Sequence, residues 1–225
     1  MTTASTTRTG EQIQRDVQDE LRWDARLQPN EIGVIVKYGV VMLTGWVDSY
    51  VKKWAAEQAA VRVARVRAVA NDIEVKLPAS AERTDTDIAA AAVMALQWDA
   101  LIPDEQVKVR VSEGWVTLGG EVEWQYQKRA AERAVRGLTG VRAVTNLISI
   151  RPPTRPLPEE LKRKISAALV RNVEIDPRRM TVDVVDDRVI LGGTVRSWTE
   201  RREADQAVWS APGVTDVVNN IVVAP

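Results

Sequence analysis

The same pattern occurs three times along the sequence: an apolar strand ending in Leu-x-Gly-x-Val, an alanine-rich helix, and a further strand that carries an asparagine. The Leu-x-Gly-x-Val segments are residues 43–47, 118–122 and 191–195, and the asparagines are Asn71, Asn146 and Asn219. Each copy is roughly 70 residues long, which exceeds the usual length of a solenoid repeat and is near the lower limit for a domain with its own core. The repeat therefore predicts three tandem domains.

Each copy begins with an amphipathic helix and a hairpin. In the first copy Ile13, Val17 and Leu21 recur every fourth residue, which places them on one face of a helix. Alternating apolar residues then lead into a two-residue turn at Tyr38-Gly39 and a strand over 40–47. The equivalent turns are Glu113-Gly114 and Asp186-Asp187. These patterns predict one helix and two antiparallel strands.

The second half of each copy is an alanine-rich helix followed by a third strand. Ser49 and Ser197 are suited to cap this helix, and Gly140 and Gly213 to end it, whereas copy one has Arg65 at that position. The third strands are expected over 69–75, 144–150 and 217–223. A strand, a helix and a strand in one sheet require a parallel, right-handed crossover. The fold class is therefore α+β: three tandem α-β-β-α-β units, each a three-stranded mixed sheet packed with two helices.

The repeat also sets the expected domain boundaries. We expect a flexible N-terminus over 1–9, followed by copy one over 10–78, copy two over 82–150 and copy three over 159–225. The segment 151–158 contains four prolines and separates copies two and three. A proline-rich segment of this kind favours extended polyproline geometry, so we interpret it as a semi-rigid linker.

The composition argues against catalysis and against nucleic-acid binding. The sequence contains no cysteine and no histidine, which removes thiolate chemistry, disulfides and the commonest general base. Lysine plus arginine and aspartate plus glutamate both total 31, and the charges nearly balance within each copy. A DNA-binding or RNA-binding domain normally has an excess of positive charge. We therefore expect a protein that is not an enzyme, needs no cofactor and does not bind nucleic acid.

The sequence gives no sign of export or membrane insertion. The first ten residues form a short, polar segment that lacks the apolar region of a secretory signal. Nowhere does an apolar stretch reach the length of about 18 residues that a transmembrane helix requires. A cytoplasmic location is therefore expected.

The elements and their motifs resemble the BON domain, named for bacterial osmotically induced and nodulation proteins. The resemblance rests on the helix, the Leu-x-Gly-x-Val hairpin, the alanine-rich helix, the Gly-Val pair and the Val-x-Asn-x-Ile strand, and copy three is most similar over 213–221. Copy one departs from the pattern at Arg65. The resemblance implies a non-enzymatic module of stress-response and envelope proteins, in which some members bind phospholipid and a cytoplasmic one binds potassium. A potassium ion is a candidate ligand on this ground alone, and the metal-binding residues are unknown.

One face of each sheet should pack against the helices, and the other differs among the copies. In copy two this outer face is mostly polar, with Trp115 as the exception. In copies one and three it is apolar, and the residues concerned are Ile35, Val40, Met42, Trp46, Val185, Ile190, Val218 and Val222. Exposing a large apolar side chain forgoes about 1.5–3 kcal/mol. We expect the outer faces of copies one and three to pack against each other or against another subunit; the alternative is a shifted strand register, which would make these residues ordinary core residues.

Aromatic and basic residues gather where the alanine-rich helix begins. The aromatic residues are Tyr50, Trp54, Trp124, Tyr126 and Trp198. Tryptophan beside lysine and arginine suits the headgroup region of an anionic membrane, so these residues are candidates for lipid binding. The alternative is that the rings fix the start of the helix onto the sheet.

The leading functional hypothesis is a cytoplasmic, stress-associated binding or scaffold protein whose modules assemble with one another or with other subunits. A potassium-responsive sensor and a peripheral binder of anionic phospholipid membranes are the alternatives. The partners expected are a second copy of the chain, another domain of the same chain, or anionic lipid.

Overall fold

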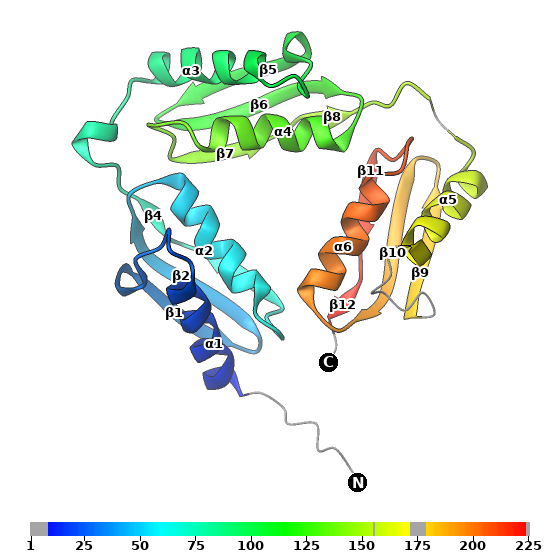
Figure 1. The fold of residues 1–225 in the computed structure, drawn as a ribbon, viewed down its shortest axis with the longest axis horizontal. Coiled ribbons are helices and arrows are strands. Elements are labelled where there is room, and N and C mark those ends of the chain that lie inside the picture. Colours follow the sequence, from blue (N-terminus) through cyan, green and yellow to red (C-terminus); the bar gives the residue numbers. More distant parts are fainter. Residues whose placement is uncertain (1–8, 155, 172–178, 224–225) are drawn as a thin grey trace. The chain divides into compact units, whose positions relative to one another are not determined.

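The computed structural model describes residues 9–154, 156–171 and 179–223, and the chain divides into two compact units after Lys76. Copy one forms the first unit, and copies two and three lie in the second. The flexible N-terminus expected over 1–9 falls, apart from Thr9, outside the described residues. The predicted fold class is confirmed in all three copies (Figure 1).

The elements follow the same order in every copy. Copy one contains α1 (Gly10–Trp23), β1 (Ile32–Lys37), β2 (Val40–Val47), α2 (Tyr50–Arg62), β3 (Ala68–Asn71) and β4 (Glu74–Val75). Copy two contains α3 (Asp85–Trp98), β5 (Val107–Ser112), β6 (Trp115–Val122), α4 (Gln125–Arg136), β7 (Ala143–Asn146) and β8 (Ser149–Ile150). Copy three contains α5 (Pro158–Arg171), β9 (Met180–Val185), β10 (Arg188–Val195), α6 (Trp198–Trp209), β11 (Asp216–Asn219) and β12 (Val222–Val223). Single 3-10 turns lie at Pro29–Glu31, Ala79–Ala81 and Asp104–Gln106.

The central strand of each sheet is the second strand of the hairpin. In copy one β2 pairs antiparallel with β1 and parallel with β3 and β4, as the crossover argument predicts. The third strand is interrupted, because β3 ends at Asn71 and β4 resumes at Glu74 along the same edge of β2. The same interruption separates β7 from β8 and β11 from β12.

The repeated asparagine causes this interruption and ties it to the second helix. The Asn71 Nδ2 atom donates to the backbone oxygen of Lys53 at 3.2 Å and to Glu57 Oε2 at 3.1 Å, while its Oδ1 accepts from the Ile73 backbone nitrogen at 3.4 Å. Asn146 makes the same three contacts in copy two. In copy three Asn219 donates to Asp205 and accepts from Ile221. The asparagine is thus a structural clamp in every copy.

Both helices pack on the same face of the sheet, and the core lies between the helices and the sheet. Val41, Leu43 and Val47 of β2 are buried to 3% exposure or less against Val17, Leu21 and the alanines of α2. The small alanine side chains allow α2 to approach the sheet closely. Equivalent residues form the core of copy three, and the strand register that the sequence predicts is therefore confirmed.

The second helix of copy two ends earlier than the sequence predicted, before Gly140. Helix α4 already ends at Arg136 with Gly137 as its C-cap, and Gly140 occupies a left-handed position in the next turn, with φ of 94°. Gly213 has φ of 99° at the equivalent point of copy three. Copy one places Arg65 there with φ of 72°, a conformation that costs a residue with a Cβ about 1–2 kcal/mol.

Replacing Arg65 by glycine is therefore expected to stabilise copy one. We expect a gain of about 0.5–1 kcal/mol, since the relief of strain exceeds the entropy that glycine adds to the unfolded chain. Urea unfolding of the Arg65→Gly protein measures the change. Arg67→Gly is the control, because Arg67 has no left-handed φ and gains nothing from glycine.

Candidate functional site

The outer face of copy one is mostly apolar. The strand register places Ile35 opposite Met42 and Met42 opposite Ala70, while Val40 lies opposite Ala68. We define the outer face as Ile35, Val40, Met42 and Trp46, whose exposed fractions are 57%, 42%, 40% and 39%. Neighbouring strands thus bring together the four residues that the sequence singled out in this copy. A surface of this kind on a folded domain indicates a binding site.

Positive charge lies at both ends of this outer face. Lys37 and Arg67 are exposed at the hairpin end, where the Arg67 backbone nitrogen donates to the oxygen of Gly39 at 2.7 Å. Within the described part of the chain, neither side chain forms an ion pair. At the other end the Lys76 ammonium lies 6.0 Å from the centre of the Trp46 ring and 3.4 Å from Glu74. The cations at the hairpin end therefore favour an acidic partner, whereas Glu74 balances the charge of Lys76 at the other end.

Copy two presents a polar surface at the equivalent positions. Thr117 occupies the position of Met42, and Glu121 forms an ion pair with Arg151 at 2.9 Å. Trp115 is 54% exposed, and its Nε1 donates to the hydroxyl of Thr145 at 2.8 Å. The polar outer face predicted for copy two is what the structure shows.

In copy three, apolar and charged residues alternate on the outer face. Val185 and Val222 are exposed, while Ile190 and Val218 are half-buried. Ile190 lies opposite Asp183 in the register, and Arg188 pairs with Asp216 at 2.8 Å beside it. The predicted residues are therefore brought to one face, but charges break it into small patches. An outer face that is mostly apolar is a property of copy one.

The aromatic residues at the start of the second helix are mostly packed. Tyr50, Trp54, Trp124 and Trp198 are half-buried, and Tyr126 is 53% exposed. In copy three the guanidinium of Arg201 stacks over the Trp198 ring at 4.7 Å. This geometry favours the interpretation that the rings fix the helix end, and lipid binding by these residues stays a prediction.

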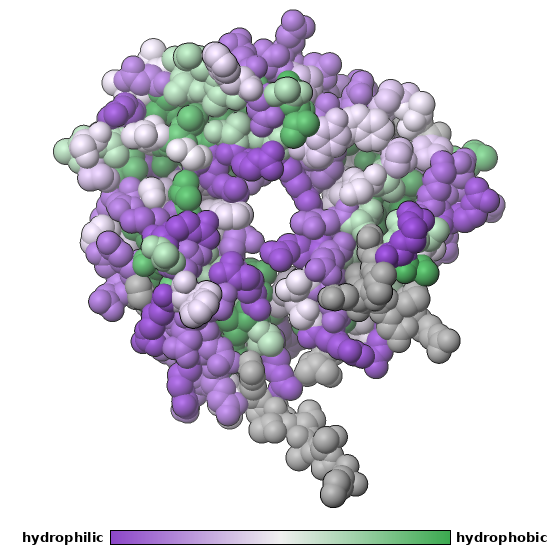
Figure 2. Space-filling view, in the orientation of Figure 1, coloured by the Kyte–Doolittle hydropathy of each residue, from purple (hydrophilic) through white to green (hydrophobic). Residues whose placement is uncertain are grey.

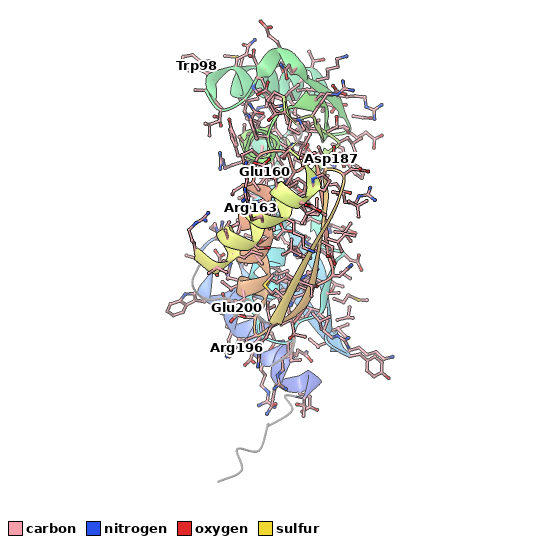
Figure 3. All side chains as sticks on the ribbon, turned by 90° about the vertical axis from the view of Figure 1, so that its right-hand side faces the viewer. Trp98, Glu160, Arg163, Asp187, Arg196 and Glu200 are labelled. Carbon is pink, nitrogen blue, oxygen red and sulfur yellow. The ribbon has the colours of Figure 1, made fainter. Side chains whose placement is uncertain are left out.

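The remaining surface offers little that resembles a reaction centre. A groove of about 700 Å³ lies between α5 and α6 of copy three, where cations and alanines line it. Figure 3 shows Arg163, one of these cations, on α5. Across the described residues, no group of three or more acidic side chains is arranged to hold a metal ion. Within the same part of the chain, every helix is too short or too polar to cross a membrane.

A second exposed apolar surface was not predicted, and it lies on α3 of copy two. Val93, Met94 and Trp98 are 45%, 58% and 85% exposed on the side of the helix that faces away from the core. The sequence did indicate this surface, because the first helices of copies one and three each have polar residues at two of these three positions.

The sequence model of the BON domain matches residues 9–76, 84–152 and 159–225, which include nearly every element described above. The chain belongs to the BON domain family. Among characterised relatives, the osmotically-inducible protein Y of Escherichia coli (strain K12) is 28% identical over 143 residues, which span 61% of this chain and 71% of the relative. This BON protein and that relative therefore share more than a single domain length.

Two solved structures of CdsD, a structural protein of the type III secretion system of Chlamydia trachomatis, also align with the chain. They are 13% and 12% identical to it, and the alignments cover 94% of this chain and 91% or 96% of theirs. The TM-score is 0.27 in both cases, which is too low to indicate a common architecture.

Proposed function

We propose that this BON protein is a non-enzymatic, stress-associated scaffold whose copy-one outer face binds protein. The observation that carries the proposal is the exposed apolar row of Ile35, Val40, Met42 and Trp46 on a sheet whose other face is already covered by both helices. A sheet with one covered and one apolar open face lacks a second layer, which another domain or subunit supplies. The name of the E. coli relative supports a role under osmotic stress.

The comparison among copies supports the proposal. All three domains keep the same inner core, so the fold itself does not require an apolar outer face. Copy two folds with Thr117 where copy one has Met42. The apolar side chains of copy one therefore have a use beyond the stability of the domain.

Met42→Glu is expected to abolish self-association. The carboxylate would enter the centre of the outer face and would be buried without a partner on assembly. Sedimentation velocity at increasing concentrations measures the effect: we expect the natural protein to grow beyond its 25.0 kDa monomer and the variant to stay monomeric.

The matched control is Thr117→Glu, which adds the same charge to the same strand position of copy two. It is expected to leave the sedimentation unchanged. Association that persists unaltered in Met42→Glu would remove the proposed role of the outer face.

A further inference from the structure

Helix α3 has two apolar faces. Ile88, Ala92 and Leu96 are buried against the sheet of copy two. On the opposite side are the exposed residues that we call the α3 stripe: Val93, Met94, Trp98 and Leu101, the last just after the helix and 50% exposed. Met94 and Trp98 are four residues apart and therefore lie on one side of the helix, Val93 lies beside Met94, and Leu101 follows three residues after Trp98. Figure 2 shows green and pale-green residues along α3, and in Figure 3 Trp98 lies on the outer side of this helix.

The stripe belongs to copy two alone. Where α3 has Val93 and Met94, α1 of copy one has Gln18 and Asp19, and α5 of copy three has Ser166 and Ala167. Only the tryptophan recurs, as Trp23 in copy one. Since both other copies fold with polar or small residues here, the apolar side chains of the stripe do not serve the fold of the domain.

The charge around the stripe is negative. No charged side chain lies between Ile88 and Trp98 on α3, and carboxylates stand at both ends, namely Asp85, Asp87 and Asp99. A hydrogen bond from the Thr84 hydroxyl at 2.6 Å holds the pKa of Asp87 below its ordinary value, and the neighbouring Arg83 lowers it further. The exposed Lys37 and Arg67 at the outer face of copy one have the opposite charge.

The two surfaces also match in form. Helix α3 has 14 residues, which corresponds to a length of about 21 Å, and β2 has 8 residues, which corresponds to about 26 Å. A helix laid on the open face of a sheet is a standard layer arrangement in folded proteins. One helix of this length is therefore sufficient to cover the outer face of copy one.

We propose that the α3 stripe of one chain packs on the outer face of copy one in a second copy of the chain. The inference rests on the proposed function and names the partner of that surface. Pairing sheet with sheet would leave the α3 stripe uncovered, and pairing helix with helix would leave the outer face of copy one uncovered. Packing α3 of one chain on the sheet of another brings the carboxylates of α3 near Lys37 and Arg67, and it buries both apolar surfaces. Each chain has one of each surface, and the two surfaces are different. The contact therefore repeats from chain to chain, and the assembly is a ring or a filament.

A complementation experiment with full-length chains tests the pairing. Met94→Asp is expected to make the protein monomeric, and the fold tolerates the change because Asp19 occupies the same position in copy one. The Met94→Asp chain keeps an intact outer face, and the Met42→Glu chain keeps an intact stripe. An equimolar mixture of the two is therefore expected to form dimers and nothing larger, although each variant alone stays monomeric.

The controls separate this inference from the proposed function. Ala167→Asp adds the same charge to the exposed equivalent position of copy three and should leave assembly unchanged. If Met94→Asp assembles like the natural protein while Met42→Glu does not, the pairing with α3 is wrong and the docking role of the outer face stands. If neither variant changes assembly, both fail. A natural protein that stays monomeric but floats with phosphatidylglycerol vesicles through Met94 would also overturn the pairing, because the occupant would then be lipid.

Discussion

Gly120→Ala is expected to unfold copy two or to destabilise it by about 3 kcal/mol or more. Gly120 has φ of 114°, a conformation that residues with a Cβ rarely adopt, and an added Cβ would collide with the backbone oxygen of Gln106. Gln106 immediately precedes Val107, which is the partner of Gly120 in the hairpin. The strand would have to move away, and the pairing of β5 with β6 would be lost at this end.

The neighbouring glycine provides the control. An added Cβ at Gly119 meets no atom within 4 Å, and copy one already has Thr44 at this position. Gly119→Ala is therefore expected to change the stability by less than about 0.5 kcal/mol. Hydrogen exchange followed on peptides of copy two measures both changes without interference from the other copies. Equal protection in the two variants would show that the backbone at Gly120 is not restricted as described.

This pair of glycines shows what the repeat can and cannot predict. Both glycines lie inside a strand and lack the sequence neighbours of a phosphate-binding loop. This context favours a close approach between the backbone of the strand and a neighbouring segment, and at Gly120 the structure confirms it. Which of the two glycines is indispensable depends on a contact with Gln106, which lies in the turn just before β5. Sequence spacing does not give such a contact.

The fold was predictable because each element repeats with its own hydrophobic period. The inner faces, the hairpin turns and the parallel crossover all follow from alternation and helical spacing, and they agree in three copies. The end of the alanine-rich helix was predicted too late, because Gly140 has a left-handed conformation that is also used in the turn after a helix.

The candidate site was predictable only in part. The outer face of copy one follows from strand parity once the inner face is known. In copy three the same parity was correct, but the sequence did not show that Arg188 and Asp216 lie side by side on adjacent strands and break the apolar surface. The α3 stripe was missed because a helix with apolar residues on both sides has no clear amphipathic pattern.

Replacing the asparagine that recurs in every copy is expected to reduce stability strongly, although the residue lies on an edge strand of the sheet. Asn219→Ala removes the contact with Asp205 at 3.3 Å and leaves the backbone nitrogen of Ile221 without its acceptor at 3.1 Å. The side chain of Ile221 is 4% exposed, so water has little access to the freed N–H group. We expect copy three to lose about 2 kcal/mol.

The next residue, Asn220, provides the control, because it tests whether any asparagine at the end of this strand has the same effect. Asn220 is exposed, and its backbone nitrogen donates to the oxygen of Leu191 at 2.8 Å, a bond that alanine retains. Asn220→Ala should therefore stay within about 0.5 kcal/mol of the natural protein in hydrogen exchange of copy three. Similar losses in both variants would contradict the clamp. A loss confined to Asn219→Ala would show that the recurring asparagine serves the fold of each copy.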